Sequence, residues 1–365
     1  MSGRPRLPGW TIALPCLGWV LLGLHLLSNA PLLTILIVAG LLGCVLAAVH
    51  HAELIAHRIG EPYGAFVLAG AVTVIEVALI VTLMAAERLE ASALARDAVF
   101  ATVMIILNGI VGLCLVVGGS RHHEQHFELL GVSAALATLA AIVVLTLVLP
   151  NYTTTVAGPI YSPSQLGFVT VVSLLLYTTF LFVQAIRHRD HFLPPEQARA
   201  GEMDEGAHAG PKAHGAVLAA SAGLLATSLV AVVLLAKTVS PAIEAGVARA
   251  GAPRSVVGVI IAAIVLLPEA WAALRAARAN RLQTSLNLAL GSALASIGLT
   301  IPAVAMVSLL TGLTLTLGID MKAQVLLLLT LFVSTLSLGT GRTTVLQGAV
   351  HLVIFAVYLF TTIVP

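Results

Sequence analysis

The sequence predicts an all-α polytopic membrane protein that crosses the bilayer about eleven times. Hydrophobic residues make up 59% of its 365 residues and charged residues 9%, and its mean hydropathy is +1.04. Soluble domains average roughly 45–50% apolar and 25% charged residues, so this composition lies far outside their range. Because an open chain in lipid must satisfy its own backbone hydrogen bonds, we expect each apolar run of about 20 residues to be a helix.

Eleven such runs follow one another, and one long polar segment interrupts them. The runs cover residues 10–27, 30–49, 64–86, 98–117, 128–150, 165–186, 215–236, 255–275, 284–310, 323–340 and 343–364. The polar segment, residues 187–214, falls between the sixth and seventh runs and carries several acids. We therefore predict an extra N-terminal helix in residues 1–29, a five-helix repeat over 30–186, a cytoplasmic acidic linker over 187–214, and a second five-helix repeat over 215–365.

Matching residues at matching positions indicate that the two five-helix segments are copies of one another. Glu76 and Glu269 each lie about twelve residues into the second apolar run of their own copy. Upstream of them, Glu53 and Glu244 each precede a glycine by seven residues and a proline by nine. An odd number of spans in each copy makes the second copy enter the membrane from the opposite side. This 1 + 5 + 5 pattern is the inverted-topology repeat of secondary transporters, whose ion sites lie near the bilayer midplane.

The distribution of basic residues sets the expected orientation. Of the 18 Lys and Arg residues, twelve fall in the N-terminal segment and every second loop after it, and six fall on the other side. The positive-inside bias places the N-terminus in the cytoplasm, so we expect a multi-pass protein of the cell inner (cytoplasmic) membrane. A formal net charge of +2, without a basic run, argues against nucleic acid, so the expected partners are the lipid bilayer, small inorganic cations and protons.

Glu76 and Glu269 are the candidate ion-binding and proton-binding residues. A carboxylate near the middle of a span costs several kcal/mol unless it faces a partner, a cavity or an ion. No apolar run offers a Lys or Arg at matching depth, so an ion site is favoured over a buried ion pair. A buried carboxylate binds either a proton or a metal cation, and the two compete for the same oxygens. If only the neutralised forms cross, the result is exchange of Ca²⁺, Na⁺ or K⁺ for protons, with no resident cofactor.

Neutral oxygens near the two acids would complete a coordination shell. Hard cations prefer carboxylate, amide, hydroxyl and carbonyl oxygens. Candidate groups are the side chains of Asn108, Asn287, Ser292 and Ser296 and the backbone carbonyl of Ile264, which Pro268 deprives of its helical N–H partner. We expect Pro268 to break its helix locally, and we expect Glu53 and Glu244 to line the entry path.

Structural interpretations of several of these residues stay open. The two asparagines would serve interhelical hydrogen bonds equally well, and the two serines suit close helix packing. Glu53 and Glu244 lie near span ends, where solvation of a charge costs little. We interpret the histidine-rich residues 122–126 as a solvated loop, and His351 as a packing histidine without a visible partner.

Two other classes of function compete with exchange. A cation channel or a non-transporting cation sensor would use the same acids, but a channel would conduct without coupling to protons. An intramembrane enzyme would need a Ser/His, Asp/Asp or His–metal constellation at one depth, and the sequence offers none. We therefore expect a transporter and not an enzyme.

Four segments around the acids resemble the calcium:cation antiporter superfamily, and within it the cation/proton exchanger branch and its bacterial ChaA-like transporters. The segments are HAELIAHRIGEPYG at 51–64, TVIEVAL at 73–79, LLPE at 266–269 and NRLQTSLNLALGSALAS at 280–296. The resemblance implies an exchanger fold in which Glu76 and Glu269 alternately bind cation and protons. It also implies site-lining roles for Asn108, Ser292 and Ser296, and entry-path roles for Glu53 and Glu244.

One departure from the family pattern affects the expected substrate. The Gly-Asn-Ala that precedes the first acid in eukaryotic exchangers is Thr73-Val74-Ile75 here, and Pro268 stands before the second acid. The resemblance therefore implies the fold and the exchange, and it leaves open whether the cation is Ca²⁺, Na⁺ or K⁺.

Overall fold

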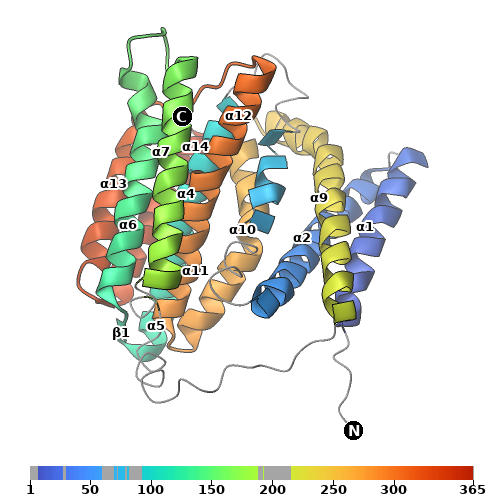
Figure 1. The fold of residues 1–365 in the computed structure, drawn as a ribbon, viewed down its shortest axis with the longest axis horizontal. Helices are drawn as coiled ribbons and strands as arrows, with labels where there is room; N and C mark the ends of the chain where they lie inside the picture. Colours follow the sequence, from blue (N-terminus) through green and yellow to red (C-terminus); the bar gives the residue numbers. More distant parts are fainter. Residues whose placement is uncertain are drawn as a thin grey trace. The chain divides into compact units, whose positions relative to one another are not determined.

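The computed structural model describes residues 7–27, 30–59, 70–71, 73–78, 80–81, 93–187, 192 and 215–364. These residues form two compact units, each of which takes helices from both predicted repeats (Figure 1). Unit 1 contains the described parts of Met1–Leu83 and Gly206–Gly251. Unit 2 contains those of Met84–Glu205 and Ala252–Pro365.

The described part of unit 1 consists of three long helices and some further helical residues. The helices are α1 (Gly9–Leu27), α2 (Pro31–Ile59) and α9 (Gly215–Arg249), and the described residues between 70 and 81 are also helical. α2 and α9 pack along each other in opposite directions, and α1 lies against both (Figure 1). Since α2 and α9 begin the two predicted repeats, unit 1 pairs equivalent helices of the two copies.

Unit 2 is a helical bundle with a two-stranded sheet at one end. Its elements in chain order are α4 (Leu94–Met104), the π-helical turn η2 (Ile105–Ile110), α5 (Val111–His122), β1 (Gln125–His126), α6 (Leu129–Val143), the π-turn η3 (Val144–Val148), the 3₁₀ turn η4 (Leu149–Tyr152), α7 (Pro163–Phe182), the π-turn η5 (Val183–Arg187), α10 (Ser255–Arg278), α11 (Leu282–Ala295), the π-turn η7 (Ser296–Thr300), α12 (Ile301–Thr311), α13 (Met321–Leu338), β2 (Arg342–Thr343) and α14 (Val345–Ile363). Consecutive elements run on without a gap, so α4, η2 and α5 form one span, and α11, η7 and α12 form another.

Ten helical segments among the described residues are long and apolar enough to cross a membrane. They correspond to ten of the eleven predicted runs, while most of the third run, residues 64–86, lies outside the described residues, as does most of the predicted linker, 187–214. The largest difference concerns the seventh run, expected to end at residue 236, because α9 continues to Arg249. Hydropathy marks only the lipid-buried part of a helix, whereas its hydrogen bonds continue into the polar region.

The two ends of unit 2 collect the loops that the alternating topology assigns to opposite sides of the membrane. At one end β1 pairs antiparallel with β2, and the Gln125 side chain donates to the Ala277 carbonyl at 3.1 Å. At the other end the Gly318 amide donates to the Pro159 carbonyl at 3.0 Å. Residues 122–126 were expected to form a solvated loop, and His123, Glu124 and His126 are exposed. Gln125 differs, because it belongs to β1 and is 2% exposed, with its amide donating to the Ala277 carbonyl and to Asn280 Oδ1.

The last helix of each predicted repeat begins with the same local device. Ser162 and Gln165 form a capping box at the start of α7, and Thr344 and Gln347 form one at the start of α14. In each case the hydroxyl accepts from the N3 amide, while the glutamine side chain accepts from the N-cap amide. Two otherwise unpaired helix N–H groups are thereby satisfied, so both helices start at a defined residue.

The π-turns η2 and η7 each pack against the last helix of the other predicted repeat. Each turn contains a glycine that meets an aromatic side chain from the last helix of the other repeat: Gly109 faces Phe355 in α14, and Gly298 faces Tyr177 in α7. A Cβ at Gly109 would lie 3.3 Å from the Phe355 ring, and one at Gly298 would lie 2.9 Å from Tyr177 Cβ. Two inverted copies of one five-helix segment are expected to pack in this reciprocal way.

Candidate functional site

Glu76 lies in unit 1 within the helical residues 73–78, and only 7% of its surface is exposed. Thr73, three residues earlier and 8% exposed, lies on the same face of the helix, because residues at i and i+3 are neighbours. The Thr73 hydroxyl makes no hydrogen bond to any described residue. A buried carboxylate and a buried hydroxyl therefore share one helix face, and sequence analysis had treated Thr73 only as a departure from the family pattern.

Glu269 lies in unit 2 near the middle of α10 and is partly buried. The preceding Pro268 is buried, and Ile264 is partly exposed. The expected break at Pro268 is absent, since α10 is one continuous helix from Ser255 to Arg278. A proline removes a single N–H donor, and the packing of α10 against α4, α5 and α11 holds the helix together across that position. The Ile264 carbonyl still lacks the N–H that any other residue at 268 would supply.

Glu53 and Glu244, the predicted entry-path acids, both belong to unit 1. Each lies near the C-terminal end of its helix, α2 or α9, and these helices run in opposite directions (Figure 1). The two acids therefore lie toward opposite ends of the helix pair. Glu53 is exposed, whereas Glu244 is partly buried and accepts a hydrogen bond from Ser240 Oγ at 2.7 Å.

Asn108 lies in the π-turn η2 and is fully buried in unit 2. Its Nδ2 donates to Thr330 Oγ1 in α13 at 2.9 Å, and its Oδ1 lies 3.2 Å from His351 Nδ1 in α14. From the sequence, Asn108 could line the ion site or form hydrogen bonds between helices, and in the structure its side chain forms hydrogen bonds to two other helices. Thr330 and His351 were not assigned to this site, and His351 has the partner that sequence inspection did not reveal.

The remaining polar candidates lie along the span formed by α11, η7 and α12. Ser296 is 4% exposed and begins η7, and Ser292 lies one helical turn earlier and is partly exposed. Asn287 is tied to other groups near the start of α11: it donates to the Phe192 carbonyl at 2.5 Å and accepts from Gln283 Nε2 at 3.0 Å. The two serines therefore lie deeper in the span than Asn287 does.

The candidate residues divide between the two units. Glu76, Glu53 and Glu244 belong to unit 1, and Glu269 belongs to unit 2 together with Asn108 and the serines of α11 and η7. Within unit 2, α10 packs against both η2 and α11, so the helix that carries Glu269 contacts both helices that carry the neutral oxygens. In the part of the chain that the structure describes, no group of three or more His, Cys, Asp or Glu side chains could hold a metal ion.

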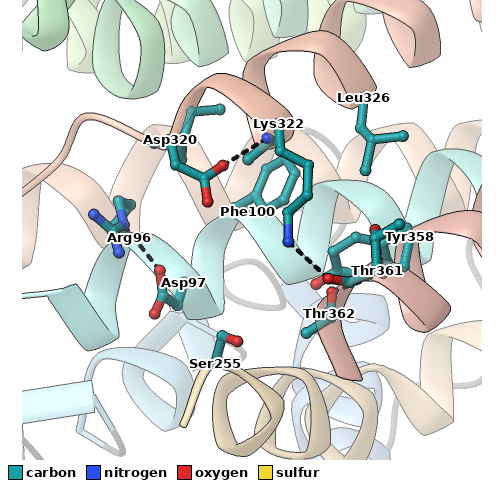
Figure 2. A pocket seen from close by; sticks show the side chains of 12 residues that line it. Arg96, Asp97, Phe100, Ser255, Asp320, Lys322, Leu326, Tyr358, Thr361 and Thr362 are labelled. Atoms are coloured by element: carbon teal, nitrogen blue, oxygen red, sulfur yellow. Dashed lines mark hydrogen bonds and ion pairs between the residues drawn. The ribbon is translucent and has the colours of Figure 1, made fainter. Parts of the chain in front are cut away.

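A pocket of about 70 Å³ opens at the end of unit 2, where α4 and α13 begin and α14 ends (Figure 2). Arg96 Nε donates to Asp97 Oδ1 at 2.8 Å, and Asp320 caps the first turn of α13. Lys322 Nζ donates to the Thr361 carbonyl at 2.7 Å, in the last turn of α14. Two acidic and two basic side chains line this pocket, so their formal charges balance and it is a poor candidate for a cation site.

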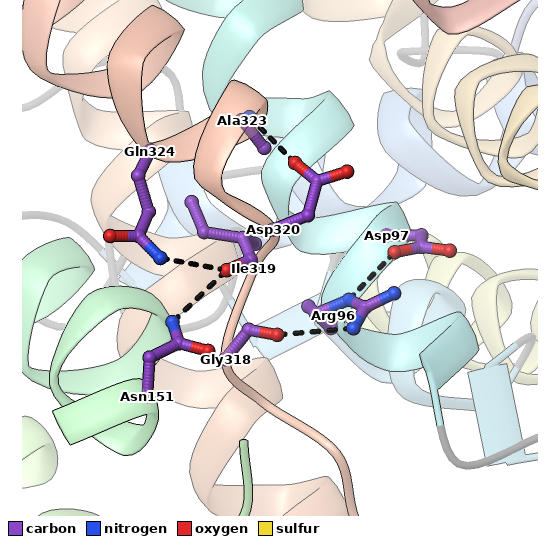
Figure 3. Close-up of polar contacts among 8 residues, drawn as sticks. All are labelled: Arg96, Asp97, Asn151, Gly318, Ile319, Asp320, Ala323 and Gln324. Atoms are coloured by element: carbon purple, nitrogen blue, oxygen red, sulfur yellow. Dashed lines mark hydrogen bonds and ion pairs between the residues drawn. The ribbon is translucent and has the colours of Figure 1, made fainter. Parts of the chain in front are cut away.

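Hydrogen bonds between segments that are far apart in the sequence hold this end of unit 2 together (Figure 3). Arg96 Nη1 donates to the Gly318 carbonyl at 3.0 Å, and the Ile319 carbonyl accepts from both Asn151 Nδ2 and Gln324 Nε2 at 3.0 Å. Arg96 and Gly318 are 222 residues apart in the chain. Local sequence patterns carry no signal for such a pair, so sequence analysis missed this cluster, whose role is to fix the ends of helices.

The ten apolar helical segments of the described residues define a multi-pass helical membrane protein. The model of the sodium/calcium exchanger protein family matches residues 29–186 and 220–364, and the chain belongs to this family. The family consists of exchangers, so this protein is an exchanger-type antiporter and not an enzyme.

Two sequence relatives match nearly the whole chain. The chain is 48% identical over 364 residues to "Putative ionic transporter y4hA" of Sinorhizobium fredii (strain NBRC 101917 / NGR234), across 99% of this chain and 97% of that protein. It is 33% identical over 329 residues to the sodium-potassium/proton antiporter ChaA of Escherichia coli (strain K12), across 90% of this chain and 88% of that protein. The predicted superfamily is confirmed.

Two solved structures share the fold. Native YfkE superimposes with a TM-score of 0.74 at 16% identity, covering 97% of this chain and 100% of that chain. The H⁺/Ca²⁺ exchanger CAX superimposes with a TM-score of 0.69 at 14% identity, covering 96% of this chain and 87% of that chain. At such low identity these structures establish the architecture and nothing about the transported ion.

Proposed function

We propose that this exchanger moves Ca²⁺, Na⁺ or K⁺ out of the cell in return for protons, with Glu76 and Glu269 binding the cation or protons in turn. One observation carries the proposal: Glu76 and Glu269 each lie within an apolar helical stretch, and Glu76 is only 7% exposed. A charged carboxylate at that depth is costly unless a proton or a cation neutralises it. Only the neutralised forms are then expected to cross, which couples the two flows.

Neutral oxygens of each unit support the carboxylates in this proposal. In unit 1 the Thr73 hydroxyl shares a helix face with Glu76. In unit 2 the Ile264 carbonyl, Ser292 and Ser296 supply oxygens from α10 and from the helix packed against it. Oxygen ligands of this kind suit Ca²⁺ and the alkali cations, and selectivity among them depends on ligand number and cavity size.

The relatives support a role for monovalent cations beside Ca²⁺. ChaA, at 33% identity, is named for sodium, potassium and protons, whereas two solved structures named for Ca²⁺ and protons, CAX and a selenium-substituted YfkE, are only 14% and 16% identical to this chain. We therefore propose Na⁺ and K⁺ as substrates to be tested on equal terms with Ca²⁺. The proposed location is the bacterial inner membrane with a cytoplasmic N-terminus, as the distribution of basic loops indicates.

Purified protein in proteoliposomes containing a pH-sensitive dye tests this function. Adding Ca²⁺, Na⁺ or K⁺ outside wild-type vesicles should change the internal pH, and competition among the three ions should rank them. Glu76→Gln and Glu269→Gln keep the size of the side chain but cannot release a proton, so each should abolish the signal. Glu124→Gln is the matched control, because Glu124 is exposed and pairs loosely with Arg342 at 3.4 Å.

Several results would contradict the proposal. Exchange that survives in both Glu76→Gln and Glu269→Gln would remove the mechanism. A cation current that is indifferent to the pH gradient would identify a channel instead. The entry-path proposal is tested in the same vesicles: Glu53→Gln and Glu244→Gln should raise the apparent KM for the cation and leave the maximal rate nearly unchanged, and an unchanged KM in both would refute it.

A further inference from the structure

His351 is a fully buried titratable residue for which the proposed exchange mechanism has no role. It lies in α14 with 0% exposure, and its Nδ1 is 3.2 Å from Asn108 Oδ1. Asn108 in turn donates to Thr330 Oγ1 at 2.9 Å. Both partners are also 0% exposed, so the three side chains form a buried polar network that joins η2, α13 and α14.

The directions of these hydrogen bonds determine which His351 nitrogen carries the proton. Thr330 Oγ1 lies 2.7 Å from the Leu326 carbonyl, which can only accept, so the Thr330 hydroxyl proton is used there. The Thr330 oxygen therefore accepts from Asn108 Nδ2, and this orients Asn108 Oδ1 toward the imidazole. Since Oδ1 can only accept, His351 Nδ1 must donate. A neutral imidazole then has a lone pair on Nε2, which makes no hydrogen bond to any described residue.

The network holds a helix segment that needs external support. Asn108 lies in the π-turn η2, and π-turns are rare, because their geometry is less favourable than that of the α-helix, and they occur frequently at functional sites. Thr330 and His351 bind the Asn108 amide from two different helices.

The supported turn lies next to the helix that carries Glu269. A cavity of about 260 Å³ is lined by Ile105, Gly109 and Ile110 from η2, and by Ala270, the residue that follows Glu269 in α10. A rearrangement of η2 would therefore change the packing of α10, which contacts this turn. In this network His351, which lies in α14, is the group that donates a hydrogen bond to Asn108 Oδ1.

We propose that His351 is a positioning residue for ion exchange: as a neutral Nδ1–H donor it fixes the Asn108 amide and, through it, the π-turn beside Glu269. This inference rests on the proposed exchange function, but it assigns His351 no part in carrying the transported proton. The geometry requires one donor at the Nδ1 position and places no demand on Nε2.

Two substitutions separate the positioning role from proton carriage. In His351→Asn the amide nitrogen takes the place of Nδ1, and in His351→Gln it takes the place of Nε2. His351→Asn should keep the maximal exchange rate within about two-fold of the wild type. His351→Gln leaves a buried acceptor unsatisfied and should lower that rate by about ten-fold. Neither variant should shift the pH profile. The exposed His126→Gln, which also removes an imidazole, is the control and should behave as wild type.

Hydrogen–deuterium exchange of residues 105–115 gives a second readout that does not depend on transport. Amides of this segment should exchange faster in His351→Gln than in the wild type and at nearly the wild-type rate in His351→Asn. Loss of transport in both variants, or a shifted pH profile in both, would show that the ring itself handles a proton and would overturn the proposal. Wild-type transport and protection in His351→Gln would overturn it as well. A wild-type protein that transports nothing would refute the exchange function, while the hydrogen-exchange comparison would still test His351.

Discussion

The close approach of α5 and α14 gives a prediction whose size can be worked out from the structure. A Cβ at Gly348 would lie 2.6 Å from the Val116 amide nitrogen and 2.8 Å from the Gly112 carbonyl oxygen. Both contacts are with backbone, which cannot rotate away. Ordinary van der Waals contact begins at 3.4 Å, so Gly348→Ala requires the two helices to separate by about 0.8 Å. Small residues permit this kind of close packing between membrane helices.

The expected free-energy change follows from two opposing effects. Overpacking typically destabilises a protein by about 1–3 kcal/mol. Replacing a helical glycine by alanine returns about 0.5–1 kcal/mol of conformational entropy. Because both close contacts are with backbone, the overpacking cost lies in the upper half of its range, and the net effect of Gly348→Ala is a destabilisation of about 1–2 kcal/mol. The separation would also lengthen the 3.2 Å contact between His351 and Asn108, because His351 lies three residues further along α14.

Thermal unfolding in detergent, followed by fluorescence-detected gel filtration, checks this estimate. The matched control is Gly167→Ala in α7, where an added Cβ has nothing within 4 Å. Gly348→Ala should lower the apparent Tm by about 3–6 °C, whereas Gly167→Ala should leave it unchanged or raise it slightly. If both variants unfold at the wild-type temperature, α5 and α14 are not packed backbone to backbone, and the reasoning fails.

Two further predictions concern polar contacts near the ends of the helices. Arg96→Gln removes a partly buried ion pair with Asp97 and a hydrogen bond to the Gly318 carbonyl, so it should destabilise the protein by about 1–3 kcal/mol in the same thermal assay. The control Arg342→Gln removes an exposed ion pair at 3.4 Å and should cost less than about 1 kcal/mol. Equal effects of the two substitutions would contradict a stabilising role for the Arg96 contacts. Burial raises the pKa of Tyr161, whose hydroxyl donates to the Leu145 carbonyl at 2.6 Å, to about 12. Because the raised pKa favours the neutral form in the folded state, its contribution to stability should be constant below about pH 10 and should be lost as the pH rises toward 12. In urea unfolding, Tyr161→Phe should be less stable at pH 7 but lose less stability between pH 10 and 12, and a parallel decline would show that Tyr161 does not titrate as described.

Sequence reasoning located the acids but not the residues that support them. A carboxylate inside an apolar run stands out against its neighbours, so Glu76 and Glu269 could be identified from hydropathy alone. His351 was visible as a histidine inside a span, yet its partner Asn108 is 243 residues away. Asn108 itself was recognised, but the orientation of its amide depends on Thr330, which is 222 residues away.

At two places the packing of distant segments produces a local structure that differs from the one expected from the sequence. Pro268 was expected to break its helix, and α10 runs through it because three neighbouring helices hold both halves in line. Residues 122–126 were expected to form a solvated loop; His123, Glu124 and His126 are exposed, but Gln125 is buried and Gln125–His126 pair with β2, because the 339–344 turn lies at the same end of the bundle. Contacts with distant segments outweighed the local tendency at Pro268, and at residues 122–126 they changed only the burial of Gln125 and the pairing of two residues.

The sequence by itself determined the membrane class and the ten spans found among the described residues, and it predicts the duplication that would make the helices equivalent in pairs. These properties follow from composition, from the length of the apolar runs and from the spacing of matching residues, all of which can be read directly from the amino-acid sequence. Only the tertiary structure decided that η2 and η7 are π-turns covered by the last helix of the other repeat, and that the Asn108 amide is held by His351 and Thr330. Such contacts join residues more than 100 positions apart, and their geometry depends on how helices pack, which hydropathy does not record.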